Sequence, residues 1–258
     1  MADVTLLIAI ISVFLISLVF SMFGQGGGSL YTPTLFLLGY AALVSISTSL
    51  VLNLVTAVSA TLIYYRNGLV DLKLSSAFVP GICAGSLVGG AATNYIDSTI
   101  LMWGFVAFLI AAGARMVYTL WEKKDEKREC PIVLTTKMLT LIILFSFAVG
   151  VLSGLLGVGG GIVIVPFLMF LCKHPTKESA GTAAFVVIFS SIFGVIGHSV
   201  VGHLDAELIL ATVIAVFVGA QIGAQYMVRA RSEIIKVGFG IIMWVFAIQL
   251  VLRLSGVV

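Results

Sequence analysis

Two glycine-rich segments interrupt apolar runs that would otherwise be predicted as continuous membrane helices. The first is Gly24-Gln25-Gly26-Gly27-Gly28, and the second is Gly157-Val158-Gly159-Gly160-Gly161. Ordered glycines lose much backbone entropy, and they leave peptide groups uncovered where lipid offers no hydrogen bond. A glycine run that leads into a new helix can also present bare N–H groups to an anion. The presence of two such segments in a membrane chain therefore calls for a structural or functional explanation, which the rest of the sequence indicates.

The composition of the chain places it in a membrane. Of its 258 residues, 60% are hydrophobic and 10% are charged, whereas a soluble domain carries roughly a quarter charged residues. Several apolar runs reach the roughly 20 residues that cross a bilayer. We therefore predict an all-α polytopic membrane protein with the lipid bilayer as its surroundings. No nucleic-acid partner is expected, because the basic residues behind the net charge of +3 lie in short loops.

Neither a cofactor nor an enzyme is expected. Cys83, Cys130 and Cys172 lack a metal-binding spacing, and their odd number argues against a disulfide framework. The apolar runs contain no carboxylate or Cys/His cluster for a metal, and no Ser/His/Asp or paired-acid pattern. The first apolar run lacks a basic n-region and a cleavage site, so we expect it to be retained.

The second half of the chain repeats the plan of the first. The predicted helical runs are 5–23, 30–38, 43–65, 74–92 and 99–120, then 137–156, the stretch from the second glycines to 172, 180–200, 206–227 and 234–252. An offset of 133 residues superposes the glycines and Pro33 on Pro166, and an offset of 134 superposes Thr48 on Thr182. These ordered matches predict an internal duplication. The predicted units are a first repeat at 1–120, a charged linker at 121–136 and a second repeat at 137–258.

The positions of Lys and Arg predict how the repeats insert. Lys123–Arg128 is the most basic loop and is expected on the cytoplasmic side. If each broken run enters and leaves on one face as a hairpin, all 14 Lys and Arg residues except Arg253 fall on that side. A hairpin plus three crossings in each half gives two inverted repeats, whereas one crossing at each break would give parallel repeats. We favour the inverted arrangement, with the glycine turns near the bilayer midplane because the following arms span only roughly 15 Å.

The two glycine turns are the first candidate for a binding site. Free N–H groups and the dipoles of the helices that follow would direct partial positive charge into the space between them. Pro33 and Pro166 are expected near the starts of those helices, where a missing N–H costs least. The alternative is that the glycines only allow close helix packing. Gly85-x-x-x-Gly89 and Gly219-x-x-x-Gly223 fit that packing role better.

Polar side chains near the turns complete the candidate site. Thr48 and Thr182 are related by the repeat and lie near the start of the helix after each hairpin. The expected substrate-binding residues are Gln25, Gly26, Gly27, Gly28, Ser29, Thr48, Ser49, Asn53, Gly159, Gly160, Gly161 and Thr182. Such hydroxyls and amides can also simply bond across helices. His198 could relay a proton, but we favour an interfacial histidine at the helix end.

The paired glycine motifs resemble those of a known family. They run as Phe23-Gly24-x-Gly26-Gly27-Gly28-x4-Pro33 and Leu155-Leu156-Gly157-Val158-Gly159-Gly160-Gly161-x4-Pro166, followed by Gly68-x-x-Asp71 and Gly202-x-x-Asp205. Over essentially the whole chain this pattern is similar to the TauE/SafE sulfite-exporter permeases. The resemblance implies transport of a small sulfur-containing anion, such as sulfite, thiosulfate or an organosulfonate, across a bacterial or archaeal inner membrane. The first copy has Gln25, Ser29 and Thr32 at positions where aliphatic residues are common in that family. The resemblance therefore leaves the particular anion open.

The function we expect is secondary transport by alternating access. Export is favoured because a negative-inside potential drives an anion outward by roughly 2.3 kcal/mol per charge per 100 mV, and no carboxylate supplies a proton path. The alternatives are a passive anion channel, a proton-coupled uptake permease for an organosulfur anion, and a non-transporting membrane scaffold. A homodimer is left open by the sequence.

Overall fold

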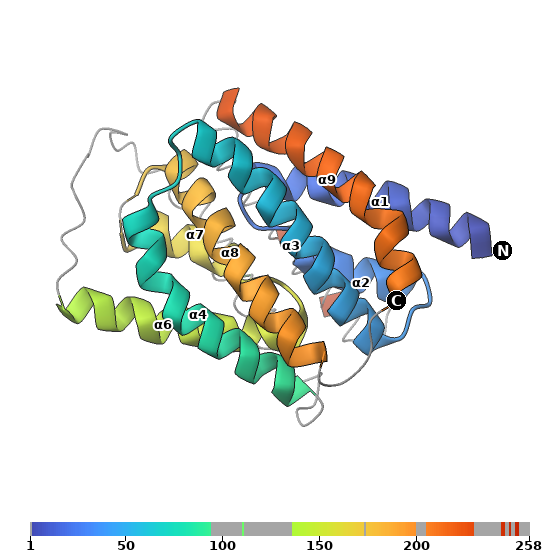
Figure 1. Ribbon diagram of the computed structural model, residues 1–258, viewed down its shortest axis with the longest axis horizontal. Helices are drawn as coiled ribbons and strands as arrows, with labels where there is room; N and C mark the ends of the chain where they lie inside the picture. The colour runs from blue at the N-terminus through green and yellow to red at the C-terminus, as the bar shows by residue number, and fades with distance from the viewer. Residues whose placement is uncertain are drawn as a thin grey trace.

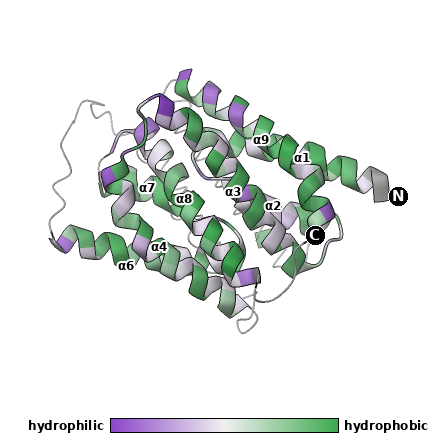
Figure 2. Ribbon diagram, viewed as in Figure 1, coloured by the Kyte–Doolittle hydropathy of each residue, from purple (hydrophilic) through white to green (hydrophobic). Residues whose placement is uncertain are grey.

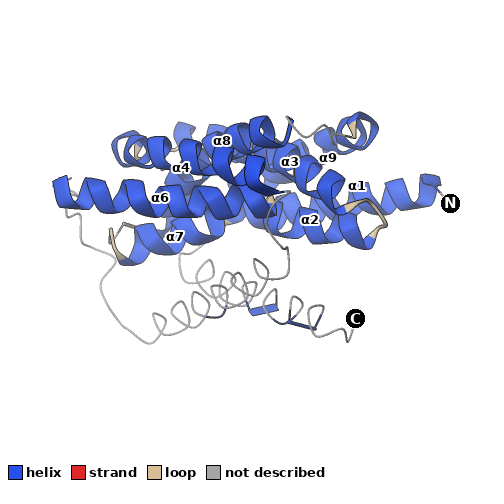
Figure 3. Cartoon of the chain, turned by 90° about the horizontal axis from the view of Figure 1, so that it is seen from below, coloured by secondary structure: helices blue, strands red, loops and turns tan. Residues whose placement is uncertain are grey.

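The structure is a computed structural model that describes residues 2–93, 110, 136–172, 174–199, 205–229, 244–245, 248 and 251–252. Over these residues it is all-helical, with no strand (Figures 1 and 3). The helices are α1 (Ala2–Met22), α2 (Gly28–Leu37), α3 (Ala42–Arg66), α4 (Leu72–Ala92), α6 (Thr136–Leu156), α7 (Gly161–Phe170), α8 (Thr176–Ser199) and α9 (Ala206–Arg229). The predicted runs 99–120 and 234–252 and the charged linker lie largely or wholly outside the described residues.

Six of the described helices are long and apolar enough to cross a membrane: α1, α3, α4, α6, α8 and α9. The helices α2 and α7 have only 10 residues each, about 15 Å of helix, so neither spans a bilayer alone. The predicted all-α polytopic membrane fold is therefore confirmed, including a short arm after each glycine segment. Figure 2 shows hydrophobic residues along the helices and hydrophilic ones gathered at helix ends.

Local chemistry explains most helix boundaries. Asp71 caps α4, because its side chain accepts a hydrogen bond from Leu74 N at 2.9 Å, and Asp205 accepts one from Leu208 N at 3.0 Å before α9. The helix α8 begins at Thr176, four residues before the predicted run, because the Pro175 carbonyl accepts from Ser179 N at 2.8 Å. Its first turn is polar, so a prediction based on apolar runs does not include it.

The placement of the two arm prolines corrects an expectation. Pro33 and Pro166 lie inside α2 and α7, which begin at Gly28 and Gly161. Each proline is thus the sixth helical residue and not part of the first turn, whose N–H groups are free in any helix. The missing proline N–H removes a backbone hydrogen bond from within each short helix.

Helices of one half pack mainly on helices of the other half. The contacting pairs include α1 with α9, α4 with α6, and α3 with α8, and α1 and α6 lie at opposite edges of the molecule (Figure 1). Side chains at Gly85 and Gly89 would overlap the Phe147 and Val151 carbonyls of α6. The predicted packing role of these glycines, and of Gly219 and Gly223 against Ser17 and Leu18 of α1, is confirmed.

This packing places the two short helices on the same side of α3 and α8 (Figure 3). The pairs α1–α9 and α6–α4 are equivalent under the repeat offset, as are α2–α3 and α7–α8. The inverted insertion of the two halves stays a prediction. What the fold positions directly is the start of α2 next to the start of α7.

Candidate functional site

The two glycine turns lie against each other. A Cβ at Gly161 would be 2.5 Å from Gln25 Cα, and one at Gly28 would overlap the Gly157 carbonyl oxygen. The residues just before the two short helices, Gly27 and Gly160, have φ of 115° and 75°, a region that L side chains rarely adopt. The glycines therefore allow both the left-handed backbone conformation and the direct contact between the turns.

Two side chains of α3, one helical turn apart, hold the turns together. Asn53 Oδ1 accepts from Gly28 N at 3.0 Å. Ser49 Oγ lies 3.1 Å from Gly28 O and 3.0 Å from Gly157 O, so its single proton is shared between the two turns. Side chains at Gly26 or Gly159 would overlap the Asn53 amide, which therefore lies between the turns.

The backbone N–H groups at the starts of the two short helices differ in their hydrogen-bond partners. In α2 the Gly28 N–H is capped by Asn53, as described above. In α7, Val163 N and Ile164 N donate to Gly160 O at 3.0 and 3.1 Å. The N–H groups of Gly161 and Ile162, and that of Ser29 in α2, make no hydrogen bond to any residue that the structure describes. The start of α7 thus presents more unpaired N–H groups than the start of α2, and with them more of the positive potential of a helix end.

Two buried side chains, Gln25 in the first turn and Thr48 in α3, have polar atoms without a partner among the described residues. Gln25 is 1% exposed and Thr48 is 0% exposed. Among the described residues, the oxygen and nitrogen of the Gln25 amide and the hydroxyl of Thr48 have no hydrogen-bond partner. A buried donor or acceptor without a partner costs about 1–3 kcal/mol, so such groups are unusual unless they serve a ligand or water.

The electrostatics of this region come from dipoles alone. Over the described ranges, the buried polar side chains include Ser, Thr, Asn, Gln and one His, but no Asp, Glu, Lys or Arg. No group of three His, Cys, Asp or Glu side chains suited to a metal ion occurs in those ranges either. Beside the second turn, Val158 and Gly160 border an apolar cavity of about 10 Å³, about the size that holds one water molecule.

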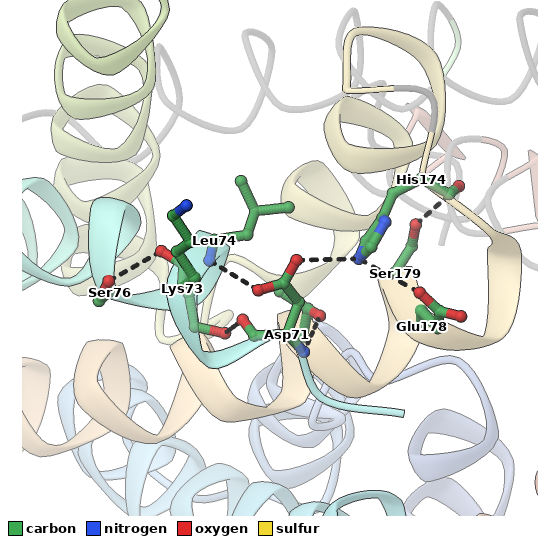
Figure 4. Close-up of polar contacts among 9 residues, drawn as sticks. Asp71, Lys73, Leu74, Ser76, His174, Glu178 and Ser179 are labelled. Carbon is green, nitrogen blue, oxygen red and sulfur yellow. Dashed lines mark hydrogen bonds and ion pairs between the residues drawn. The ribbon is translucent and has the colours of Figure 1, made fainter. Parts of the chain in front are cut away.

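Thr182, the repeat partner of Thr48, is bound elsewhere. Its Oγ1 accepts from Asp71 N at 3.0 Å, which ties α8 to the start of α4. Asp71 Oδ2 lies 3.8 Å from His174 Nε2, which in turn lies 3.7 Å from Glu178 Oε2 (Figure 4). The structure thus joins Thr182 to a charged cluster at the α7–α8 connection. It brings Gln25, Gly26–Gly28, Ser49, Asn53 and Gly159–Gly161 together at the turns.

The equivalent end of the first half contains a tyrosine. Tyr40 occupies the position that corresponds to His174, and its pKa is raised by burial and then by the carboxylates of Asp205 and Glu207. At the α7–α8 connection, burial raises the pKa of the Cys172 thiol to about 11. His174 was not predicted as a site residue, although its mismatch with Tyr40 in the repeat alignment was a usable signal.

Sequence reasoning also missed a serine cluster and the burial of a histidine at the end of α8. Ser190 Oγ lies 3.0 Å from Ser86 Oγ and 2.6 Å from Ser153 Oγ, which links α8 to α4 and α6. His198 is 3% exposed, with Nε2 2.8 Å from Gly154 O. The ring is thus buried against the α6 backbone in the last turn of α8, and its place at the membrane interface stays a prediction. Its role as a proton relay stays a prediction.

The fold and the site together define a polytopic membrane protein with an uncharged polar region between two half-helices. A family model described as Sulfite exporter TauE/SafE matches residues 9–250. The chain therefore belongs to the TauE/SafE family of membrane transporters, a class of permeases and not of enzymes.

Relatives of the chain are described in the same terms. It is 27% identical over 250 residues to the probable membrane transporter protein YunE of Bacillus subtilis (strain 168), covering 90% of this chain and 92% of that protein. It is 27% identical over 259 residues to the probable membrane transporter protein MJ0441 of Methanocaldococcus jannaschii, covering 93% and 92%. Over 108 residues it is 34% identical to Sulfite exporter TauE/SafE family protein 1 of Arabidopsis thaliana, covering 42% and 23%. No solved structure matches the chain.

Proposed function

We propose that this protein is a secondary transporter that exports a small sulfur-containing oxyanion, such as sulfite, thiosulfate or an organosulfonate, across the cytoplasmic membrane. The observation that carries the proposal is a set of buried polar groups, in the turns and in α3, that have no partner among the described residues. They are the Gln25 amide, the Thr48 hydroxyl and the N–H groups of Gly161 and Ile162. The sulfur chemistry comes from the family to which the chain belongs.

These groups suit an anion that binds and then leaves. The helix dipole and the free N–H groups at α7 supply positive potential, while the Gln25 amide and the Thr48 hydroxyl supply directional donors. Hydrogen bonds to an ion are roughly twice as strong as neutral ones, so a few of them offset much of the lost hydration. Because the described residues place no Lys or Arg in the site, release breaks no buried salt bridge with them.

Transport by this site requires exposure to each side of the membrane in turn. In the proposed mechanism the two inverted repeats move against each other around the turns, as in other transporters with discontinuous helices. Outward movement of the anion follows the electrical gradient by roughly 2.3 kcal/mol per charge per 100 mV. Export therefore needs no coupling ion.

Paired cysteines test the inverted arrangement. Ala41 and Leu171 lie at exposed positions after α2 and α7, so Ala41→Cys and Leu171→Cys in a cysteine-free chain are accessible reporters. With inverted repeats, an impermeant maleimide labels Leu171→Cys from the cytoplasmic side and Ala41→Cys from outside. Labelling of both positions from one side would instead establish parallel repeats.

The transport proposal is tested by replacing Gln25 with its repeat counterpart. The purified protein is screened by thermal shift against sulfite, sulfate, thiosulfate and organosulfonates, and flux is measured in proteoliposomes. In Gln25→Val we expect an unchanged or higher melting temperature without anion, because an unpaired buried amide is removed. Anion affinity should fall about tenfold or more with the loss of an ion-directed hydrogen bond.

Gln225→Val is the matched control, since Gln225 is exposed at the end of α9 and should leave both properties unchanged. Wild-type protein that neither binds nor transports any of these anions would remove the proposal. Flux that rises linearly with concentration would favour the passive channel. Uptake that depends on an imposed pH gradient would favour the proton-coupled permease.

A further inference from the structure

The positive end of α2 is already occupied by a side chain of the protein itself. Asn53 Oδ1 accepts from Gly28 N at 3.0 Å, at the place where the start of a helix attracts an anion. The N-cap residue Gly27 offers no side-chain cap of its own. A partly negative amide oxygen therefore lies where an anion oxygen would lie at this turn.

The other end of the Asn53 amide is tethered to the second half. Its Nδ2 donates to Ser191 Oγ of α8 at 2.8 Å, and both side chains are 0% exposed. The tether and the Gly28 bond together fix the orientation of the amide, with its oxygen toward α2. Glycines at positions 26 and 159 leave the room that the amide fills.

The repeat provides no such cap for α7. The residue equivalent to Asn53 at the offset of 134 is Val187, which is buried and apolar. The N–H groups of Gly161 and Ile162 accordingly have no partner among the described residues. At the helix start the two turns thus differ in the presence of an internal capping group.

We propose that Asn53 is an internal competitor of the transported anion. This inference rests on the proposed function. An entering anion first meets the free donors of α7, Gln25 and Thr48, and then displaces Asn53 Oδ1 from Gly28 N. The new bond is charge-assisted and so stronger than the neutral bond it replaces. When the anion leaves, Asn53 caps Gly28 again, which lowers the affinity and pairs the Gly28 N–H.

The test compares three variants of the full-length protein by thermal shift at pH 8, with sodium sulfite as the probe. Asn53→Asp places a fixed carboxylate at the start of α2. We expect loss of the sulfite-induced shift, because the carboxylate takes the place of the anion at Gly28 N. Asn53→Ala leaves Gly28 N free, so we expect a lower melting temperature without sulfite and a sulfite affinity about fivefold tighter, the equivalent of one neutral hydrogen bond.

Ser191→Ala is a milder variant that removes only the tether of the amide. It should also tighten sulfite binding, by less than Asn53→Ala. Weaker sulfite binding in Asn53→Ala would make Asn53 a direct ligand and overturn the proposal. Lower melting temperatures in both Asn53 variants with unchanged sulfite affinity would reduce Asn53 to a structural residue. Wild-type protein that binds none of the screened anions would instead overturn the proposed function itself.

Discussion

The two glycine turns have the same glycine spacing, yet they use their polar groups differently. The first turn contains Gln25 with an unpaired amide, and its helix start is capped by Asn53. The second has Val158 at the equivalent position, and its helix starts with two N–H groups that bond to no described residue. The duplication therefore supplies a shared scaffold, and the substitutions between copies change which polar groups are unpaired among the described residues. Side-chain donors come from one half and backbone donors from the other.

The threonines that follow the hairpins show the same division. Thr182 accepts from the Asp71 N–H and belongs to a cluster with His174, whereas the Thr48 hydroxyl has no partner in the described part of the chain. Identical residues at equivalent positions thus differ in their surroundings: Thr182 pairs with the backbone before α4, whereas Thr48 has no hydrogen-bond partner among the described residues. Three further experiments test this contrast between the halves, beginning with the largest expected effect.

The first prediction separates backbone strain from contact between the halves. Gly24, Gly157 and Gly68 have nearly the same φ, 67°, 71° and 69°, so alanine costs each of them about 1–2 kcal/mol in strain. A Cβ at Gly24 would overlap the Ala180 carbonyl, one at Gly157 would lie 3.0 Å from Ile46 O, and one at Gly68 would meet nothing within 4 Å.

We therefore expect Gly24→Ala to lose more than about 4 kcal/mol, Gly157→Ala about 2–3 kcal/mol and Gly68→Ala only the strain. Melting followed by size-exclusion chromatography gives the order. Equal losses at Gly24 and Gly68 would show that the turns do not depend on their contact with α8.

The second prediction concerns the pH dependence of a thiol at the α7–α8 connection. Burial raises the pKa of Cys172 to about 11, so less thiolate is present at neutral pH than in an ordinary cysteine. Maleimide alkylation at pH 7.5 should be slower than that of an exposed thiol by roughly a hundredfold. The rate should rise with pH until about pH 11.

The control for this measurement is Leu171→Cys in a chain without Cys172, because Leu171 is 53% exposed. Both proteins carry alanine at the other native cysteines. A Cys172 rate equal to that of the control at pH 7.5 would mean that the connection of the second half is open and not packed into the core.

The third prediction compares the two threonines directly. Thr182→Val should destabilise the protein by about 1 kcal/mol, because it leaves the Asp71 N–H without its acceptor. Thr48→Val should leave the melting temperature unchanged or slightly higher, since the hydroxyl it removes has no partner, but it should weaken anion binding. Thermal shift with and without sulfite measures both effects. Equal behaviour of the two variants would contradict the functional asymmetry of the halves.

Much of the fold follows from the sequence because lipid leaves few choices. An apolar segment in a bilayer must satisfy its backbone internally, which only a helix does for a single segment. The observed α1, α3, α4, α6 and α9 accordingly agree with the predicted runs to within three residues at each end. The glycine breaks and Asp71 and Asp205 before α4 and α9 are also local features, visible as matches between the two copies. The start of α8 was missed because its polar first turn lies outside any apolar run.

The details of the site depended on tertiary structure. Nothing near Gly28 in the chain indicates that Asn53, 25 residues away, caps it, or that Ser191 tethers the same amide. Thr48 and Thr182 are indistinguishable by residue type and repeat position, and only the packing of α8 on α4 pairs one of them. A hydrogen bond requires a donor–acceptor distance within a range only a few tenths of an ångström wide. The sequence by itself thus determined the helices, the breaks and the repeat, whereas the approach of distant helices decided how the polar groups of the described residues are paired.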